Sequence, residues 1–337
     1  MKKINVGLIG LGVGSHHLQT YMQHMNCNVL QVCDFDIKKL KKISNKYKNK
    51  FDITTNANEL IENKNIDLVS IASYDNFHYE QIVGCIQNKK HIFVEKPMCL
   101  SLGEMKSIKK LLAKNPKIKI SCNFVLRTTP VFKKFKRDIL NNKYGEIFNI
   151  EANYMWGRKE KFNGWRKEMP FYSKILGAGV HMLDLVIWML NKRPISVFSS
   201  GNMLGTKNID IKYNTFVSMI FQFSNSLIVN IGANGPCIYP HSHEISTYGD
   251  FKTTKLTSQG LLKVSKKNFI NKRLDRIKNI YPRKKLRSYI LKNFIGSILS
   301  NNKKNPISKK QIFDVMSACL AAEVSMRKNK LVKIKYL

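Results

Sequence analysis

Short apolar runs alternate with amphipathic stretches over the first third of the chain, and this alternation limits the possible fold more than any other feature. The apolar runs are residues 4–9, 29–33, 67–72 and 91–94, and helical patterns occupy residues 37–47 and 77–87 between them. Such an alternation predicts βαβ units and a parallel sheet. Crossover helices cover both faces of that sheet, so its strands are expected to be apolar throughout.

A glycine-rich turn follows the first apolar run and reads Gly10-Leu11-Gly12-Val13-Gly14-Ser15. Gly10 permits a tight turn, and Gly12 lets the backbone approach a pyrophosphate at the N-terminus of the next helix. A third glycine is expected at position 15, and Gly14 lies one residue early. Asp34, at the end of the second strand, stands where a carboxylate reaches the adenosine ribose and repels a 2′-phosphate. The pattern predicts NAD rather than NADP; the alternative is a glycine-rich turn that binds no nucleotide.

The composition bounds the class of protein. With 337 residues, 43% of them apolar, the chain is long enough for about two domains with a large core. This excludes a disordered chain and a small disulfide scaffold. The 58 Lys and Arg residues against 22 Asp and Glu give a net charge of +36, which attracts polyanions. The charge is explained either by a bias toward Lys, Ile and Asn or by a selected polyanion surface.

Neither disulfides, metals nor membranes are indicated. The seven cysteines are scattered without a C-x-x-C pair, which favours a reducing cytoplasm and gives no zinc-type spacing. The first 14 residues imitate a secretory signal but lack a following cleavage site, so we interpret them as a buried strand. The most apolar window elsewhere, residues 175–190, contains His181 and Asp184 and is too short to span a bilayer.

Several motifs in order resemble the Gfo/Idh/MocA family, whose members include glucose–fructose oxidoreductase and inositol dehydrogenase. After the glycine turn come Ile71-Ala72-Ser73-Tyr74 with His78, then Glu95-Lys96-Pro97, Asn123, Arg127-Thr128-Thr129-Pro130, Trp165-Arg166, Gly179-Val180-His181-Met182-Leu183-Asp184 and Pro240-His241-Ser242-His243. The ending, residues 306–334, is also similar to the family. Ser73 and Tyr74 replace the family's Thr and Pro. The resemblance spans nearly the whole chain.

The resemblance implies an α/β fold, with an N-terminal doubly wound Rossmann domain and a C-terminal α/β domain that has an open, mostly antiparallel sheet. We place these domains at residues 1–125 and 126–337. The residues agree, because residues 216–223 alternate between an apolar face and a mixed face, as do residues 227–231. A mixed outer face of this kind commonly packs on another subunit, so a homodimer or homotetramer is expected.

The resemblance also implies the site. Lys96 positions the substrate oxygen and His181 is the acid/base, although a solvated lysine and a core histidine are the alternatives. The cofactor-binding set is Gly10, Gly12, Gly14, Asp34, Ala72, Ser73, His78, Glu95 and Lys96. The substrate-binding set is Asn123, Arg127, Trp165, Arg166 and His243, with His241 facing the same side as His243. Gly177 stands where the family has an Asp, four residues before His181, and Asp184 is interpreted as structural.

Residues 263–292 hold twelve Lys or Arg and one acid, Asp275. This basic segment is either a solvated surface or a site for the diphosphate of a nucleotide-linked sugar. It carries no nucleic-acid-binding signature, so specific nucleic-acid binding is not expected. The sequence thus predicts a cytoplasmic NAD(H)-dependent oxidoreductase acting on a CH–OH group of a sugar, cyclitol or nucleotide sugar. The alternatives are an inert NAD- and sugar-binding protein of the same fold and a polyanion-binding protein.

Overall fold

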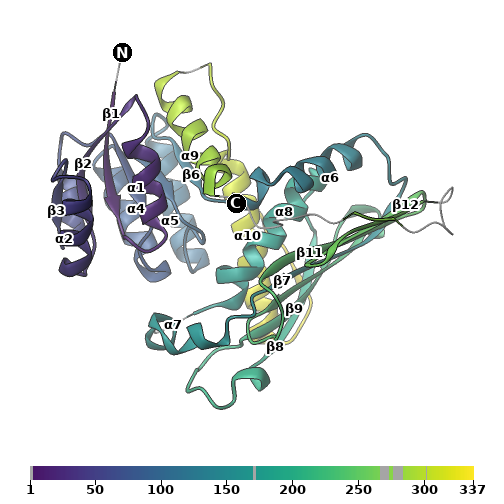
Figure 1. Ribbon diagram of the computed structural model, residues 1–337. Coiled ribbons are helices and arrows are strands. Elements are labelled where there is room, and N and C mark those ends of the chain that lie inside the picture. The colour runs from purple at the N-terminus through teal and green to yellow at the C-terminus, as the bar shows by residue number, and fades with distance from the viewer. Residues whose placement is uncertain (1–2, 170–171, 266–272, 276–283, 301) are drawn as a thin grey trace. The chain divides into compact units, whose positions relative to one another are not determined.

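The computed structural model describes residues 3–169, 172–265, 273–275, 284–300 and 302–337 (Figure 1). The chain forms two compact units. The first comprises Met1–Asn123, Lys284–Phe313 and Leu337, and the second comprises Phe124–Arg283 and Asp314–Tyr336. The chain therefore passes between the units more often than the single boundary predicted after residue 125.

Six parallel strands form the sheet of the first unit, in the order β3-β2-β1-β4-β5-β6. In chain order they are β1 Ile4–Ile9, β2 Cys27–Cys33, β3 Asp52–Thr54, β4 Leu68–Ile71, β5 His91–Val94 and β6 Ile120–Cys122. The strand order reverses between β1 and β4. In sheets of this type ligands bind outside the carboxyl ends of the strands at that reversal. The predicted Rossmann sheet is confirmed.

Helices connect these strands and bury them on both faces. They are α1 Gly14–Met22, α2 Ile37–Lys46, α3 Ala57–Glu62, α4 His78–Gln87 and α5 Leu102–Lys114. Side-chain caps mark where three of them begin. The Asp36 carboxylate accepts from the Lys38 and Lys39 amides before α2, and Asn56 Oδ1 accepts from the Asn58 amide before α3. Ser101 Oγ accepts from the Glu104 amide in the same way before α5. Such caps satisfy amides that have no partner within the helix.

Helix α9, Lys284–Leu299, belongs to the first unit although it comes late in the chain. It packs on α1 and β5, and the Phe294 ring lies 5.9 Å from the ring of Phe93 on β5. Ile290, Leu291 and Ile295 are also buried. Burial of these apolar residues explains why the helix packs on the first unit. The prediction that all residues after 125 belong to the second domain therefore does not hold for this helix.

Nine strands form the sheet of the second unit, in the order β14-β13-β12-β11-β7-β10-β9-β8-β15. They are β7 Ile147–Met155, β8 Ser196–Asn202, β9 Phe216–Gln222, β10 Ile228–Asn234, β11 Ser242–Gly249, β12 Lys252–Thr257, β13 Gly260–Ser265, β14 Arg273–Asp275 and β15 Val332–Lys333. Only β7 and β10 pair in parallel among these neighbours. The predicted mostly antiparallel sheet is confirmed.

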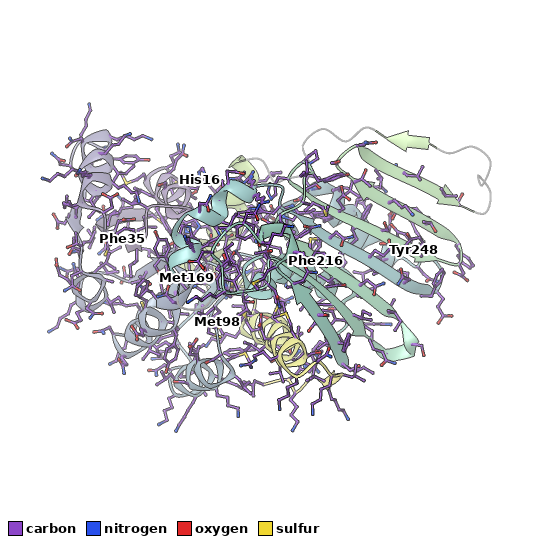
Figure 2. All side chains as sticks on the ribbon, turned by 90° about the horizontal axis from the view of Figure 1, so that it is seen from below. His16, Phe35, Met98, Met169, Phe216 and Tyr248 are labelled. Carbon is purple, nitrogen blue, oxygen red and sulfur yellow. The ribbon has the colours of Figure 1, made fainter. Side chains whose placement is uncertain are left out.

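The two faces of this sheet differ as the alternation predicts. In β9, Val217, Met219 and Phe221 are fully buried, whereas Ile220 on the other face is 44% exposed. The outer face also carries polar contacts, because Tyr248 Oη donates to Glu151 Oε2 at 3.0 Å. Figure 2 labels Tyr248 on this sheet, and the face it occupies is where the predicted homodimer or homotetramer contact would lie.

Helices accompany this sheet in the described part of the chain. They are α6 Pro130–Leu140, the short α7 Trp165–Glu168, α8 Val180–Leu190 and α10 Lys309–Lys328. Helix α8 packs on β7 and α6, and α10 is tied to β8 because the Ser199 amide donates to Ser325 Oγ at 2.9 Å. A π-helical turn, Ile175–Gly179, leads directly into α8. Wide turns of this kind are rare and recur at functional sites.

Candidate active site

The glycine turn has the shape that a dinucleotide requires. Gly10 has a φ of +92°, and a Cβ there would lie 2.3 Å from the Ala72 carbonyl oxygen. A Cβ on Gly12 would meet no atom within 4 Å, so the space above it is open. Gly14 packs α1 on β4, since its Cβ would lie 3.1 Å from Ala72 Cβ. Gly14 thus makes the close helix–strand contact of the usual third glycine, one position before Ser15.

Asp34 lies directly after β2 and beside this turn. Its Oδ2 accepts from the Leu11 amide at 2.7 Å, and its Oδ1 accepts from the Asp36 amide at 2.9 Å. Each carboxylate oxygen can accept a further hydrogen bond. The two amides hold the carboxylate at the carboxyl end of β2, where the sequence predicts the ribose hydroxyls.

An aromatic pair beside Asp34 was not predicted. Phe35, labelled in Figure 2, is 67% exposed. Its ring centroid lies 5.6 Å from that of Tyr74, in the loop after β4. Lys39 Nζ lies 5.2 Å from the Phe35 ring centroid. Tyr74 occupies the position of the family's Pro, and this departure is the one sequence signal from which the pair could have been found. The pair offers flat apolar surface next to the predicted ribose position.

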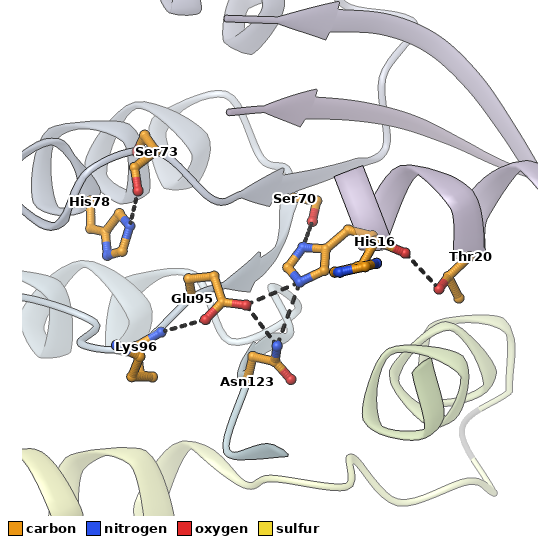
Figure 3. A network of polar contacts seen from close by, with 9 residues as sticks. His16, Thr20, Ser70, Ser73, His78, Glu95, Lys96 and Asn123 are labelled. Atoms are coloured by element: carbon orange, nitrogen blue, oxygen red, sulfur yellow. Dashed lines mark hydrogen bonds and ion pairs between the residues drawn. The ribbon is translucent and has the colours of Figure 1, made fainter. Parts of the chain in front are cut away.

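His78 connects the loops that follow β4 and β5. Its Nδ1 lies 2.6 Å from the Pro97 carbonyl oxygen. Its Nε2 lies 3.2 Å from the Ser73 carbonyl oxygen (Figure 3). Ser73 Oγ donates to Gln81 Oε1 at 2.7 Å. The imidazole therefore fixes the backbone on either side of the strand ends. Direct contact of Ser73 or His78 with a cofactor stays a prediction.

Glu95 is the centre of a buried polar network at the carboxyl ends of β4, β5 and β6 (Figure 3). His17 Nε2 lies 3.1 Å from Glu95 Oε1, and Asn123 Nδ2 donates to the same oxygen at 2.7 Å. The other nitrogen of His17 lies 3.1 Å from Ser70 Oγ. Burial acts to raise the pKa of Glu95, but the bonds to His17 and Asn123 outweigh it and bring the pKa to about 2. Glu95 is thus ionised at neutral pH.

This network supports the turn that carries Lys96. The Lys96 amide donates to Glu95 Oε2 at 3.3 Å, and the Lys96–Pro97 peptide is cis. Lys96 itself is partly exposed. His17 was missed because its partners lie 53 and 78 residues away in sequence. Asn123 was predicted to bind substrate; its amide nitrogen is bonded to Glu95, and substrate contact stays a prediction.

In the second unit, His181 belongs to a cluster of four rings, which we call the histidine–tyrosine cluster: Tyr154, His181, His241 and His243. The His181 ring stacks on Tyr154, with centroids 5.8 Å apart and planes 13° apart. His243 lies 4.7 Å from the Tyr154 centroid and 6.1 Å from that of His181. His241 lies 5.5 Å from Tyr154, so both histidines meet the same ring, as their alternation predicts.

The cluster contains polar groups of different character. His241 Nε2 lies 3.2 Å from Tyr154 Oη, and its Nδ1 lies 3.2 Å from Arg158 Nη2. Burial, with His241 close by, lowers the pKa of His243 to about 3, so His243 is neutral at neutral pH. His181 thus stacks on a phenol ring whose hydroxyl meets His241, and His241 in turn meets the Arg158 guanidinium. Tyr154 and Arg158 were missed because no motif marks them.

Arg127 forms a buried ion pair with Asp184. Arg127 Nε donates to Asp184 Oδ2 at 3.0 Å, and Nη2 donates to Oδ1 at 2.6 Å. Arg127 is 6% exposed and Asp184 is 1% exposed. Burial raises the pKa of Asp184, and Arg127 opposes that rise. The structural role expected for Asp184 fits this geometry. Because Arg127 Nε and Nη2 donate to Asp184, contact of Arg127 with a substrate stays a prediction.

Trp165 and Arg166 pack within the second unit. Arg166 Cζ lies 4.3 Å from the Trp165 ring centroid and 5.1 Å from that of Trp156. Arg166 Nε also donates to Tyr172 Oη at 3.4 Å. Neither residue is shown to touch a ligand, and the prediction that they cover cofactor or substrate stays open.

The structure does not test two of the predictions, the joint action of Lys96 with His181 and the phosphate site in the basic segment. Lys96 lies in the first unit and His181 in the second, so their action on one substrate stays a prediction. Of the basic segment, residues 263–265, 273–275 and 284–292 are described, in β13, β14 and α9. The predicted phosphate site in this segment falls largely on residues outside the described ones. Within the described part of the chain, no helix is long and apolar enough to cross a membrane.

Two family models match this chain in succession. The model described as oxidoreductase family, NAD-binding Rossmann fold, matches residues 4–124, and the GFO/IDH/MocA C-terminal domain matches residues 132–253. The chain belongs to the Gfo/Idh/MocA family. It is therefore an NAD-binding oxidoreductase of that family.

The chain is similar to several dehydrogenases over most of its length. Myo-inositol 2-dehydrogenase of Thermotoga maritima is 22% identical over 254 residues, which cover 73% of each chain. Glucose-6-phosphate 3-dehydrogenase of Bacillus subtilis is 25% identical over 244 residues, 68% of this chain and 67% of that one. A solved structure of scyllo-inositol dehydrogenase from Lactobacillus casei, with bound NAD(H) and scyllo-inositol, has a TM-score of 0.79 at 19% identity, covering 98% and 99% of the two chains.

The residues present fit the cofactor of the family. The open space above Gly12 is where the backbone can approach a pyrophosphate, and the N-terminus of α1 begins two residues later. Asp34 lies at the same edge of the sheet for the ribose, and Phe35 with Tyr74 offers an apolar face beside it. These residues would hold NAD, which supplies a hydride acceptor or donor when bound.

Proposed function

We propose that this chain is an NAD(H)-dependent dehydrogenase or reductase that acts on a secondary hydroxyl or keto group of a sugar or cyclitol. The observation that carries the proposal is His181, a partly exposed histidine at the start of α8 whose ring is held by stacking on Tyr154. A positioned imidazole is the group most often used to accept a proton from a reacting hydroxyl. The names of the family's relatives, inositol and glucose-phosphate dehydrogenases, support the substrate class.

In this proposal His181 takes the hydroxyl proton of the substrate and Lys96 donates a hydrogen bond to the same oxygen. Glu95 and His78 hold the backbone turn that carries Lys96. Tyr154, His241 and Arg158 supply donors and acceptors suited to a ligand with many hydroxyl groups. Hydrogen-bonding sites of this kind discriminate strongly against analogues that lack a hydroxyl.

A panel of myo-inositol, scyllo-inositol, glucose, glucose 6-phosphate and UDP-glucose, each with NAD⁺, tests the activity through NADH absorbance. We expect turnover with at least one polyol. Lys96→Met and His181→Ala should each lower kcat by roughly 10²–10⁴-fold and leave NADH binding intact. The double variant should be little worse than either single variant, because the two groups act together. Lys106→Met, at an exposed position of α5, is the matched control.

A second function is favoured by one residue. Gly177 removes the carboxylate that the family places before the histidine, which favours a protein that binds NAD and a sugar without turnover. The same panel separates the two functions. Polyol binding in the presence of NADH, measured by calorimetry, together with no NADH formation from any substrate, would support the inert protein.

Other observations bear on the cellular compartment and the oligomeric state of the protein. All seven cysteines are free thiols, and five of them are buried. Burial raises the pKa of Cys27 and Cys33 to about 12, so these thiols are poorly reactive. These observations support a reducing cytoplasm. The partly apolar outer face of the large sheet supports a homodimer or homotetramer, which light scattering of the purified protein would test.

A further inference from the structure

The position left by the missing carboxylate is filled by another polar group. A Cβ on Gly177 would lie 2.5 Å from Tyr172 Oη and 2.9 Å from Tyr172 Cζ. The phenol oxygen therefore occupies the space where any side chain at position 177 would begin. Residue 177 precedes His181 by four positions, which is about one turn of a helix. Tyr172 is thus a hydroxyl group at the place from which the family's acid would act.

The Tyr172 ring is held firmly in this place. It packs against Tyr213, with centroids 5.0 Å apart, and edge-on against Trp165 at 5.9 Å. The next residue, Ser173, donates to Glu323 Oε1 and accepts from the Leu176 amide at 2.9 Å. The π-helical turn that contains Gly177 begins two residues later. Because the ring and the following residue are both held, the Tyr172 hydroxyl loses little conformational entropy when it binds a ligand.

The charges around Tyr172 favour its use as a hydrogen-bond donor. Arg166 Nε donates to Tyr172 Oη at 3.4 Å, and Arg166 Cζ lies 5.8 Å from the ring centroid. Because Arg166 occupies an acceptor position of the oxygen, the phenol proton is left to donate elsewhere. Tyr213, the other phenol of the group, is harder to ionise: burial raises its pKa, Tyr172 raises it further and Arg166 opposes the rise.

We propose that the Tyr172 hydroxyl takes the place of the family's carboxylate and donates a hydrogen bond to the substrate oxygen whose proton passes to His181. This inference rests on the proposed function. Tyr172 keeps its own proton throughout, so it orients the oxygen and stabilises the negative charge that develops there. The site then works without an acid at position 177, and the loss of that acid in Gly177 is explained by the space that Tyr172 needs.

Two tyrosine variants provide a matched test. Tyr172→Phe removes one oxygen and keeps the ring packing, so the variant should fold with an unchanged melting temperature. We expect kcat for the best polyol of the panel to fall about 10²-fold, with KM changed much less. Tyr213→Phe removes a buried hydroxyl that has no hydrogen-bond partner among the described residues. The Tyr213 ring centroid lies 5.0 Å from that of Tyr172, so the variant changes a phenol next to the one under test. This control should leave kcat unchanged.

A third variant tests the geometry itself. Gly177→Ala introduces a real Cβ against Tyr172 Oη, and the hydroxyl must move away. We expect kcat to fall toward the Tyr172→Phe value. The double variant Gly177→Ala/Tyr172→Phe should lose clearly less than the product of the two single losses, because the hydroxyl can be lost only once. Additive losses in the double variant would overturn the inference.

The remaining outcomes separate this inference from the proposed function. A wild-type protein that turns over a polyol while Tyr172→Phe stays within about threefold of it overturns the inference and leaves the proposed function standing. Equal losses in Tyr172→Phe and Tyr213→Phe would assign the effect to ring packing and overturn it also. A wild-type protein that neither oxidises nor binds any polyol of the panel defeats the proposed function, and the inference with it.

Discussion

Replacing Arg127 with Leu tests whether this arginine serves the structure or the substrate. The substitution leaves the Asp184 carboxylate, 1% exposed, without its bidentate partner. Both side chains are buried, so solvent screens the pair weakly, and removing one partner of such a pair costs about 3–5 kcal/mol. For a unit of this size that is a drop in Tm of about 6–20 °C.

The pH dependence of this loss has a definite sign. Burial raises the pKa of Asp184 in the wild type, and the loss of Arg127 raises it further. The folded variant therefore keeps a proton that the unfolded chain releases above about pH 4, and its stability falls as the pH rises beyond that value. Urea unfolding of wild type and variant at several pH values measures the difference, which should shrink toward low pH.

Two further variants complete this experiment. Arg127→Leu/Asp184→Leu removes both charges and should recover most of the lost stability, because well-packed apolar residues replace buried pairs at little cost. Lys167→Met breaks the exposed pair with Asp210, where the atoms are 4.0 Å apart, and should change stability by less than about 1 kcal/mol. A stable Arg127→Leu protein with a strongly raised KM for the polyol would refute the structural role and return Arg127 to the substrate site.

Three other residues give predictions in the first unit. Asp34→Ala should narrow the preference for NADH over NADPH in fluorescence titrations; equal affinities in the wild type would defeat the role of this carboxylate. Phe35→Ala should weaken NADH binding by roughly 5–100-fold, as expected for lost base stacking, without changing Tm, and unchanged affinity would exclude the ring from the adenine site. Because hydrogen bonds lower the pKa of Glu95 to about 2 from 4.5, its ionised form stabilises the fold above pH 4.5 and that contribution is lost as the pH falls toward 2. Glu95→Gln should therefore flatten the stability curve in this window, and an unchanged curve would contradict the network.

The fold was predictable because its signals are local. The continuous apolar strands and the glycine turn needed only a few neighbouring residues each, and the alternation in residues 216–223 identified the antiparallel sheet. The return of α9 was not predictable in this way. Its apolar residues resemble those of any buried helix, and their partner Phe93 lies about 200 residues earlier.

The site was predictable where a motif marks a residue. Gly10, Asp34 and Lys96 are marked by their spacing and by the resemblance. Tyr154 was missed because it meets His181, His241 and His243 only when distant segments fold together. Tyr172 was missed although it lies close in sequence to Arg166 and Gly177, because no motif marks a tyrosine at that position. Arg127 shows the converse: it stands in a familiar motif, but its Nε and Nη2 are bonded to Asp184, 57 residues away.

Helix α9 has a consequence for how the chain is made. The first unit lacks this helix until synthesis has passed residue 299, although residues 1–123 are complete about 180 residues earlier. At about 5–20 residues per second, that interval lasts roughly 10–35 s. During this time the side of α1 and β5 that α9 later covers, including Phe93, faces water or a chaperone. A nascent chain stopped at residue 123 is therefore expected to associate with holdase chaperones, and one extended through residue 313 is expected to leave them.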